Sequence, residues 1–225
     1  SKEMEGEKMI KIEDLDLVTR EKLLYNGNAE LKRGFIYGLS ARNGSGKTTL
    51  LRTIAGIRSE TKGSIYYISN HEIYSLPELK RKLFYYESSE WFDPNLTGFD
   101  YLTFIQREWS NKNACIDDVV DYWEMNQYIK IPIKKYSLGM KQRVLLGLYE
   151  VSGAEYWLMD EPTIGLDTNS IEKFEKLLAR EKGKNKAILF SSHQDDRIYK
   201  VCDYIYELGN GSLVMREASQ KGENR

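Results

Sequence analysis

Residues 40–49 have the composition and spacing of a loop that binds phosphate groups. They read Ser-Ala-Arg-Asn-Gly-Ser-Gly-Lys-Thr-Thr and stand between a short apolar run and a helical pattern. The glycines at 44 and 46 let the backbone curl so that amide groups point at phosphate oxygens, and the start of a helix favours an anion there. We expect Lys47 to reach the β and γ phosphates and Thr48 to offer its hydroxyl to Mg²⁺. The predicted nucleotide-binding residues are Arg42, Asn43, Gly44, Ser45, Gly46, Lys47, Thr48 and Thr49.

A pair of carboxylates follows a second apolar run, at 156–159. Asp160 and Glu161 would lie at the carboxyl end of a buried strand, the edge at which α/β sheets bind ligands. We expect Asp160 to hold Mg²⁺ through water, and Glu161 to activate or orient the water that attacks the γ phosphate. Acidic residues also cap helix starts, so this pair taken alone is equally consistent with a capping role.

Two further side chains are candidates for the same site. The stretch Pro-Thr-Ile-Gly-Leu-Asp directly follows the carboxylates, and we expect its Asp167 to reach a facing subunit. His193 ends a third apolar run, where an imidazole could donate a hydrogen bond to a γ phosphate. His71 has no such setting and is predicted to lie on the surface. The predicted catalytic residues are Lys47, Glu161 and His193.

The elements that would position these residues form an α/β pattern. The apolar runs at 35–39, 156–159 and 187–190 are short and lack helical period, which indicates buried parallel strands. Helical patterns stand between them, with apolar faces at Leu50, Leu51, Ile54 and Ile57 and at Ile171, Phe174, Leu177 and Leu178. The segments 10–17, 63–68 and 204–215 read as strands of a more antiparallel kind.

The region from about 94 to 153 is mostly helical, with one apolar stripe at Leu96, Phe99, Leu102 and Ile105 and another at Val119, Tyr122 and Trp123. We therefore predict one α/β domain of the P-loop type: a mixed sheet core at about 1–93 and 154–215, an antiparallel β layer, an inserted helical subdomain at about 94–153, and a polar tail at 216–225.

The composition excludes several classes of protein. The chain of 225 residues has 33 lysines and arginines against 34 aspartates and glutamates, so no overall basic field favours nucleic acid. Its two cysteines, Cys115 and Cys202, are far apart and suggest neither a disulfide framework nor a zinc site. No apolar run approaches the roughly 20 residues that cross a bilayer, and the polar start does not resemble a signal peptide. We expect a protein of the reducing cytosol.

The motifs in this order resemble the ATP-binding cassette (ABC) family, and the deciding stretch is Tyr-Ser-Leu-Gly-Met-Lys-Gln-Arg at 136–143. The family signature is usually Leu-Ser-Gly-Gly-Gln. Ser137 and Gly139 match this signature, whereas the residues beside them differ from it. The resulting form of the signature resembles that of export-type cassettes. The resemblance extends from about residue 10 to 215. It implies that Ser137, Leu138 and Gly139 act on ATP and Mg²⁺ held by a second ABC ATPase subunit, either an identical copy or a related chain.

The resemblance also implies a function. We expect an ATP-hydrolysing subunit, peripheral at the cytoplasmic face of the cell membrane, that powers a transporter whose membrane-spanning permease is a separate chain. Export of a peptide, an antibiotic or a lipid-like compound fits the form of the signature. The alternative is a soluble ABC ATPase of assembly or remodelling, such as iron-sulfur cluster maturation.

Outside the signature, the chain departs from the family pattern at three further places. Ala41 replaces the first glycine of the phosphate loop, which is tolerable if its backbone keeps a negative φ. The loop 85–89 lacks the usual glutamine at Mg²⁺, and Glu87 or Ser88 is expected to take its place. The stretch 17–20 lacks an aromatic residue for adenine, so we expect weak discrimination between ATP and GTP. The segment 87–94, with Trp91 and Phe92, is the expected dock for the membrane subunit, although packing explains Trp91 equally well.

Overall fold

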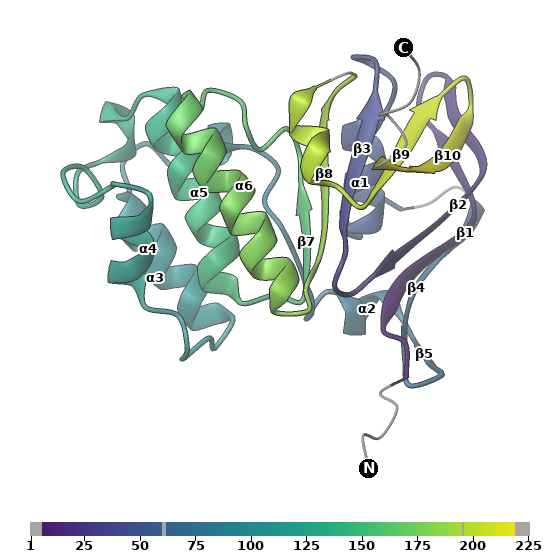
Figure 1. Ribbon diagram of the computed structural model, residues 1–225, viewed down its shortest axis with the longest axis horizontal. Helices are drawn as coiled ribbons and strands as arrows, with labels where there is room; N and C mark the ends of the chain where they lie inside the picture. The colour runs from purple at the N-terminus through teal and green to yellow at the C-terminus, as the bar shows by residue number, and fades with distance from the viewer. Residues whose placement is uncertain (1–5, 60–61, 195, 219–225) are drawn as a thin grey trace.

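The computed structural model describes residues 6–59, 62–194 and 196–218. It contains two β-sheets and a lobe of helices (Figure 1). The smaller sheet is antiparallel, in the order β2-β1-β4-β5, and comprises β1 (Met9–Val18), β2 (Lys22–Lys32), β4 (Lys62–Ser69) and β5 (Glu72–Tyr74). This is the predicted antiparallel layer.

The larger sheet is mixed, in the order β10-β9-β3-β8-β7-β6, and all its neighbours are parallel except β10 and β9. Its strand β8 lies between β3 and β7, although both of those come earlier in the chain. The strands are β3 (Ile36–Ala41), β6 (Leu83–Tyr85), β7 (Tyr156–Met159), β8 (Ala187–His193), β9 (Tyr204–Gly209) and β10 (Ser212–Glu217). The predicted fold class, an α/β fold with a mixed sheet and an antiparallel layer, is confirmed.

Each face of the large sheet is covered by its own core. Successive side chains of a strand point to opposite faces, so Tyr156 and Leu158 of β7 join one cluster while Trp157 and Met159 join the other. The first cluster is completed by the small sheet and by α1 (Lys47–Ile54). The second is completed by α5 (Leu138–Ser152) and α6 (Thr168–Gly183). Buried on both faces, these strands read as continuous apolar runs.

The helical lobe lies between β6 and β7 in the chain and stands beside the large sheet (Figure 1). Its helix α5 is buried along most of its length against α3 and α4. No helix in the described ranges is both long and apolar enough to span a bilayer. The lobe and its connections contain η1 (Ser89–Trp91), α3 (Gly98–Glu108), α4 (Ile116–Tyr122) and η2 (Ile133–Lys135), and α2 (Leu76–Leu79) and η3 (Arg197–Val201) lie elsewhere.

Several predictions of detail are wrong. Helix α1 ends at Ile54 because Gly56 adopts a φ of 69°, and Ile57 beyond it is exposed. Leu96 is also exposed, since the capping box of Thr97 and Asp100 starts α3 after it. Strand β10 continues to Glu217, so the predicted polar tail begins too early, and residues 219–225 lie outside the described part.

Candidate active site

The phosphate-binding loop connects β3 to α1. Gly44 and Gly46 have φ values of 77° and 98°, a left-handed conformation that glycine adopts without strain. Ala41 is the last residue of β3 and keeps an extended backbone, which explains why a first glycine is not needed. A cavity of about 320 Å³ opens on the loop. It is lined by Thr19, Leu23, Asn43, Gly44, Gly46, Lys47, Thr48, Thr49 and Glu161. Arg42 and Ser45 are the predicted binding residues outside this lining.

The ammonium group of Lys47 lies at the carboxyl ends of β3 and β8. The residue is buried, and its Nζ donates to the carbonyl oxygens of Ser192 at 3.1 Å and Ala41 at 3.4 Å. Glu161 Oε1 is 3.5 Å from the same nitrogen. Lys47 is thus a buried cation paired with a single, partly exposed carboxylate, which suits the binding of an anionic ligand.

Thr48 and Asp160 come together at the end of β7. The hydroxyl Oγ1 of Thr48 donates to Asp160 Oδ2 at 2.6 Å, and the other carboxylate oxygen accepts from the hydroxyl of Ser191 at 2.7 Å. Burial raises the pKa of Asp160, and the two hydrogen bonds oppose that shift. A hydroxyl and a carboxylate in contact beside a phosphate loop supply the hard oxygen ligands that Mg²⁺ prefers, so the residues fit the metal.

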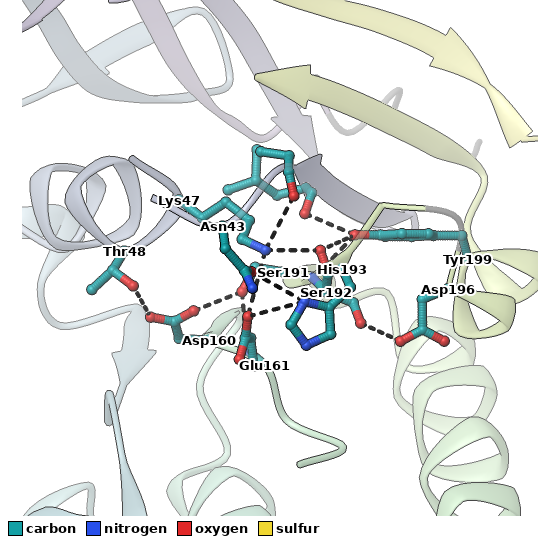
Figure 2. A network of polar contacts seen from close by, with 12 residues as sticks. Asn43, Lys47, Thr48, Asp160, Glu161, Ser191, Ser192, His193, Asp196 and Tyr199 are labelled. Carbon is teal, nitrogen blue, oxygen red and sulfur yellow. Dashed lines mark hydrogen bonds and ion pairs between the residues drawn. The ribbon is translucent and has the colours of Figure 1, made fainter. Parts of the chain in front are cut away.

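Glu161 lies at the opening of the same cavity, next to two other predicted catalytic residues. Its Oε1 is 3.5 Å from Lys47 Nζ and 4.0 Å from Nδ1 of His193 (Figure 2). His193 ends β8, and its Nδ1 is 3.2 Å from Oδ1 of Asn43 in the phosphate loop. The structure thus brings Lys47, Glu161 and His193 into one group.

Sequence reasoning missed the buried residues that support this group. Ser191 contacts both Asp160 and the backbone of Glu161. The hydroxyl of Tyr199 accepts a hydrogen bond from the Ser192 amide at 3.0 Å and lies 2.9 Å from the Leu39 carbonyl oxygen, so it ties β8 to β3. The signal in the sequence was the pair of serines directly before His193.

The signature stretch begins α5 and lies in the helical lobe. The Oγ of Ser137 accepts from the Met140 amide at 3.2 Å and so caps the helix, while the side chain stays exposed. Leu138 is exposed too. A Cβ added to Gly139 would come within 2.8 Å of the Gly165 carbonyl oxygen, so the signature packs tightly on the loop after Glu161. Within the described ranges, no hydrogen bond or ion pair joins the signature to Lys47.

Asp167 is engaged within the chain as the N-cap of α6. Its Oδ1 accepts from the Ser170 amide at 2.8 Å, and its Oδ2 is 3.3 Å from a guanidinium nitrogen of Arg143. The hydrogen bonds from Ser170 lower the pKa of the Asp167 carboxyl. Its side chain remains 62% exposed, so one face of the carboxylate is accessible.

Glu87 and Ser88 are also engaged by residues of their own chain. Glu87 forms a two-point ion pair with Arg52 of α1, with Nε donating to Oε2 at 2.6 Å. Its charge helps to raise the pKa of Asp160. The Oγ of Ser88 caps η1 by accepting from the Glu90 amide at 3.1 Å. In the described part of the chain, neither side chain bonds to Thr48 or Asp160.

The predicted docking segment is only partly exposed. Trp91 is 51% exposed and meets the ring of Tyr86 edge-on. Phe92 is buried and packs against Tyr86 and Tyr101, so the expectation that Phe92 forms part of a docking surface is wrong.

The chain is similar in sequence to ATP-binding proteins of ABC transporters. The profile of the ABC transporter family matches residues 24–164. The lantibiotic transport ATP-binding protein SrtF of Streptococcus pyogenes is 26% identical over 217 residues, which cover 96% of this chain and 93% of that protein. The bacitracin transport ATP-binding protein BcrA of Bacillus licheniformis is 30% identical over 209 residues, or 92% of this chain and 68% of that protein.

A solved structure described as an ATP-binding subunit of an ABC transporter has the same fold. It superposes with a TM-score of 0.82 at 23% identity and covers 93% of this chain and 90% of its own. The family profile extends from β2 to the residues just after the two carboxylates, and so includes the phosphate loop, the signature and Asp160 with Glu161. This chain therefore belongs to the ABC transporter family and carries its ATP-binding domain.

Proposed function

We propose that this chain binds and hydrolyses ATP with Mg²⁺, and that it does so as one of two cassettes that power a separate membrane permease. The observation that carries the proposal is the group formed by Lys47, Thr48, Asp160, Glu161 and His193 around the phosphate loop. It combines a cation for phosphate, oxygen ligands for a metal, and a carboxylate for water on one edge of the sheet.

The residues divide the chemistry between them. Lys47 and the loop amides bind the β and γ phosphates, and Lys47 moves from the Ser192 carbonyl oxygen to a phosphate oxygen. Thr48 and Asp160 would hold Mg²⁺, and the ion would neutralise charge on the phosphates. Glu161 orients the attacking water and accepts its proton, and His193 donates a hydrogen bond to the γ phosphate.

The signature is proposed to act on ATP bound by a second cassette. The start of α5 presents backbone amides and the Ser137 hydroxyl to solvent, which suits an anion. Leu138 and Ile164, both exposed, flank this helix start and provide apolar surface for a partner. Asp167 lies at the end of the same loop, and its side chain is 62% exposed. It is proposed to reach across to that partner.

The coupling to transport is proposed from the relatives. SrtF and BcrA are named for transport of a lantibiotic and of bacitracin. By analogy, this chain works at the cytoplasmic face of the membrane, with an exporter of a peptide, antibiotic or lipid-like compound. The half-exposed Trp91 is proposed to contact the permease. Glu87, which is paired with Arg52, is proposed to occupy the position of the glutamine that is usual in the family.

The variant Glu161→Gln tests the proposal, with the exposed Glu172→Gln on α6 as its control. Wild type and the control should hydrolyse ATP in the presence of Mg²⁺. Glu161→Gln should bind ATP but lose turnover by about a hundredfold or more, because water activation is removed while the phosphate contacts remain. Light scattering should then show an ATP-dependent dimer of Glu161→Gln. A wild-type chain without ATPase activity, or a monomeric and fully active Glu161→Gln, would refute the proposal.

A further inference from the structure

The hydroxyl of Ser191 lies between the two carboxylate residues of the active site (Figure 2). Its Oγ is 2.7 Å from Asp160 Oδ1 and 2.9 Å from the backbone nitrogen of Glu161. The residue is completely buried on β8, the strand that pairs with both β3 and β7. It does not line the cavity on the phosphate loop. Ser191 therefore contacts two active-site residues without lining the cavity itself.

The direction of both hydrogen bonds follows from the groups involved. A backbone N–H can only donate, and an ionised carboxylate can only accept. Ser191 therefore gives its single proton to Asp160 and accepts from Glu161. The Ser191 side chain is completely buried, while Asp160 and Glu161 are partly exposed. If the hydroxyl is removed, a donor and an acceptor lose their shared partner together.

Each contact holds one of the two carboxylate residues in position. Asp160 is fixed by Ser191 through one oxygen and by Thr48 through the other. Glu161 has a φ of 47°, a left-handed conformation that is unusual for a residue with a side chain. Such a conformation persists when the surroundings hold it in place, and the bond from the Glu161 amide to Ser191 does this.

We propose that Ser191 is a positioning residue for ATP hydrolysis. Its hydroxyl holds Asp160 against Thr48 for binding of Mg²⁺ and holds the turn that directs Glu161 toward the attacking water. The inference rests on the proposed function, because it assigns a role within that same ATPase site. Residues that orient metal ligands in this way typically contribute about ten- to hundredfold to metal affinity or activity.

The test compares Ser191→Ala with Ser152→Ala in the full chain. Ser152 is a matched control: it is buried in α5, donates to the Tyr149 carbonyl oxygen at 2.7 Å and accepts from the Ala154 amide at 3.1 Å. Each substitution removes one buried hydroxyl with two hydrogen bonds, so a general loss of stability should affect both variants alike. Only Ser191→Ala should change the site.

Two measurements separate positioning from stability. Binding of a fluorescent ATP analogue without Mg²⁺ should stay within about twofold of wild type in both variants, because the phosphate loop is intact. In Ser191→Ala, the gain in ATP affinity on adding Mg²⁺ should fall about tenfold. In the same variant kcat should fall about ten- to hundredfold, and KM should rise by about the factor that the affinity for Mg²⁺–ATP loses. In Ser152→Ala, both quantities should resemble wild type.

If Ser191→Ala does not fold, Ser191→Thr and Ser191→Val decide, since they share one shape and differ in the hydroxyl. Ser191→Thr should keep the effect of Mg²⁺ and most of kcat, and Ser191→Val should lose both. The inference is overturned if Ser191→Ala matches Ser152→Ala, or if Ser191→Thr and Ser191→Val behave alike. Either result with an active wild-type chain leaves the proposed function intact, whereas a wild-type chain without Mg²⁺-dependent turnover removes the proposed function itself.

Discussion

Glu87 and Arg52 form a two-point ion pair that joins the loop after β6 to the helix that follows the phosphate loop. The Glu87 side chain is 10% exposed, and Arg52 is 43% exposed. The Glu87 end of the pair is therefore largely buried, and the Arg52 end is in contact with water. The pair links the phosphate-binding region directly to the segment that leads to Trp91.

The first prediction concerns the stability of this pair. Arg52→Ala should lower the free energy of unfolding by about 1–2 kcal/mol, because it leaves a buried carboxylate without its partner, although solvent around Arg52 reduces the loss. Adding Glu87→Gln to Arg52→Ala should recover part of it, since the amide is neutral. Urea denaturation of the single and double variants measures the coupling. Strictly additive losses would show that the pair contributes nothing.

The second prediction concerns the nucleotide base. Among the residues that the structure describes, Thr19 and Leu23 line the cavity beside the phosphate loop and no aromatic side chain does. ATP and GTP should therefore compete with less than about hundredfold discrimination, and Thr19→Tyr should strengthen ATP binding by about 1–3 kcal/mol through stacking. Arg20→Tyr, exposed and outside the lining, is the control. Equal gains in both variants would argue against a base site at Thr19.

The third prediction concerns the loop that packs on the signature. Gly165 has a φ of 74°, and a Cβ there would come within 2.6 Å of Leu138 Cγ. In the Glu161→Gln background, Gly165→Ala should leave ATP binding by the monomer unchanged but weaken the ATP-dependent dimer about tenfold or more. Gly183→Ala in α6 meets no atom within 4 Å and should change neither property. Sedimentation with and without ATP distinguishes the two variants, and a dimer of normal strength in Gly165→Ala would contradict the prediction.

The fourth prediction concerns the membrane partner. Tagged chain captured from detergent-solubilised membranes of its native host should bring down a multi-spanning protein in stoichiometric amount, identified by mass spectrometry. Trp91→Ala should reduce this recovery several-fold, because a half-exposed aromatic side chain is a typical interface anchor. Ile73→Ala, at a more exposed apolar residue on β5, is the control. Recovery of soluble proteins alone would favour a cassette of assembly or remodelling.

The parts of the site that depend on local sequence could be predicted. The phosphate loop is defined by residues that are consecutive, and the carboxylates directly follow an apolar strand, so Lys47 and Glu161 could be assigned to one edge of a sheet. Thr48 and Asp160 could both be assigned to Mg²⁺ from the sequence, but the direct hydrogen bond between them is seen only in the structure.

The parts that depend on strand order could not be predicted. Ser191 meets Asp160 only because β8 lies beside β7, and nothing within either strand specifies its neighbour. Strand β2 was missed because Asn26, Gly27 and Asn28 interrupt its apolar pattern, although pairing with β1 holds it extended. The burial of Phe92 could not be predicted for a similar reason, because it depends on a contact with the ring of Tyr101 in α3.

The position of β8 has a consequence for synthesis of the chain. Lys47 leaves the ribosome long before β8 and Asp160 shortly before it, yet β8 is the strand that separates β3 from β7 and supplies Ser191 to Asp160. A nascent chain that ends before this strand has both halves of the site without the element that holds them in register. The last parallel pairings are therefore long-range in sequence and form late. Competence to bind and hydrolyse ATP is thereby acquired only when translation of the domain is nearly complete.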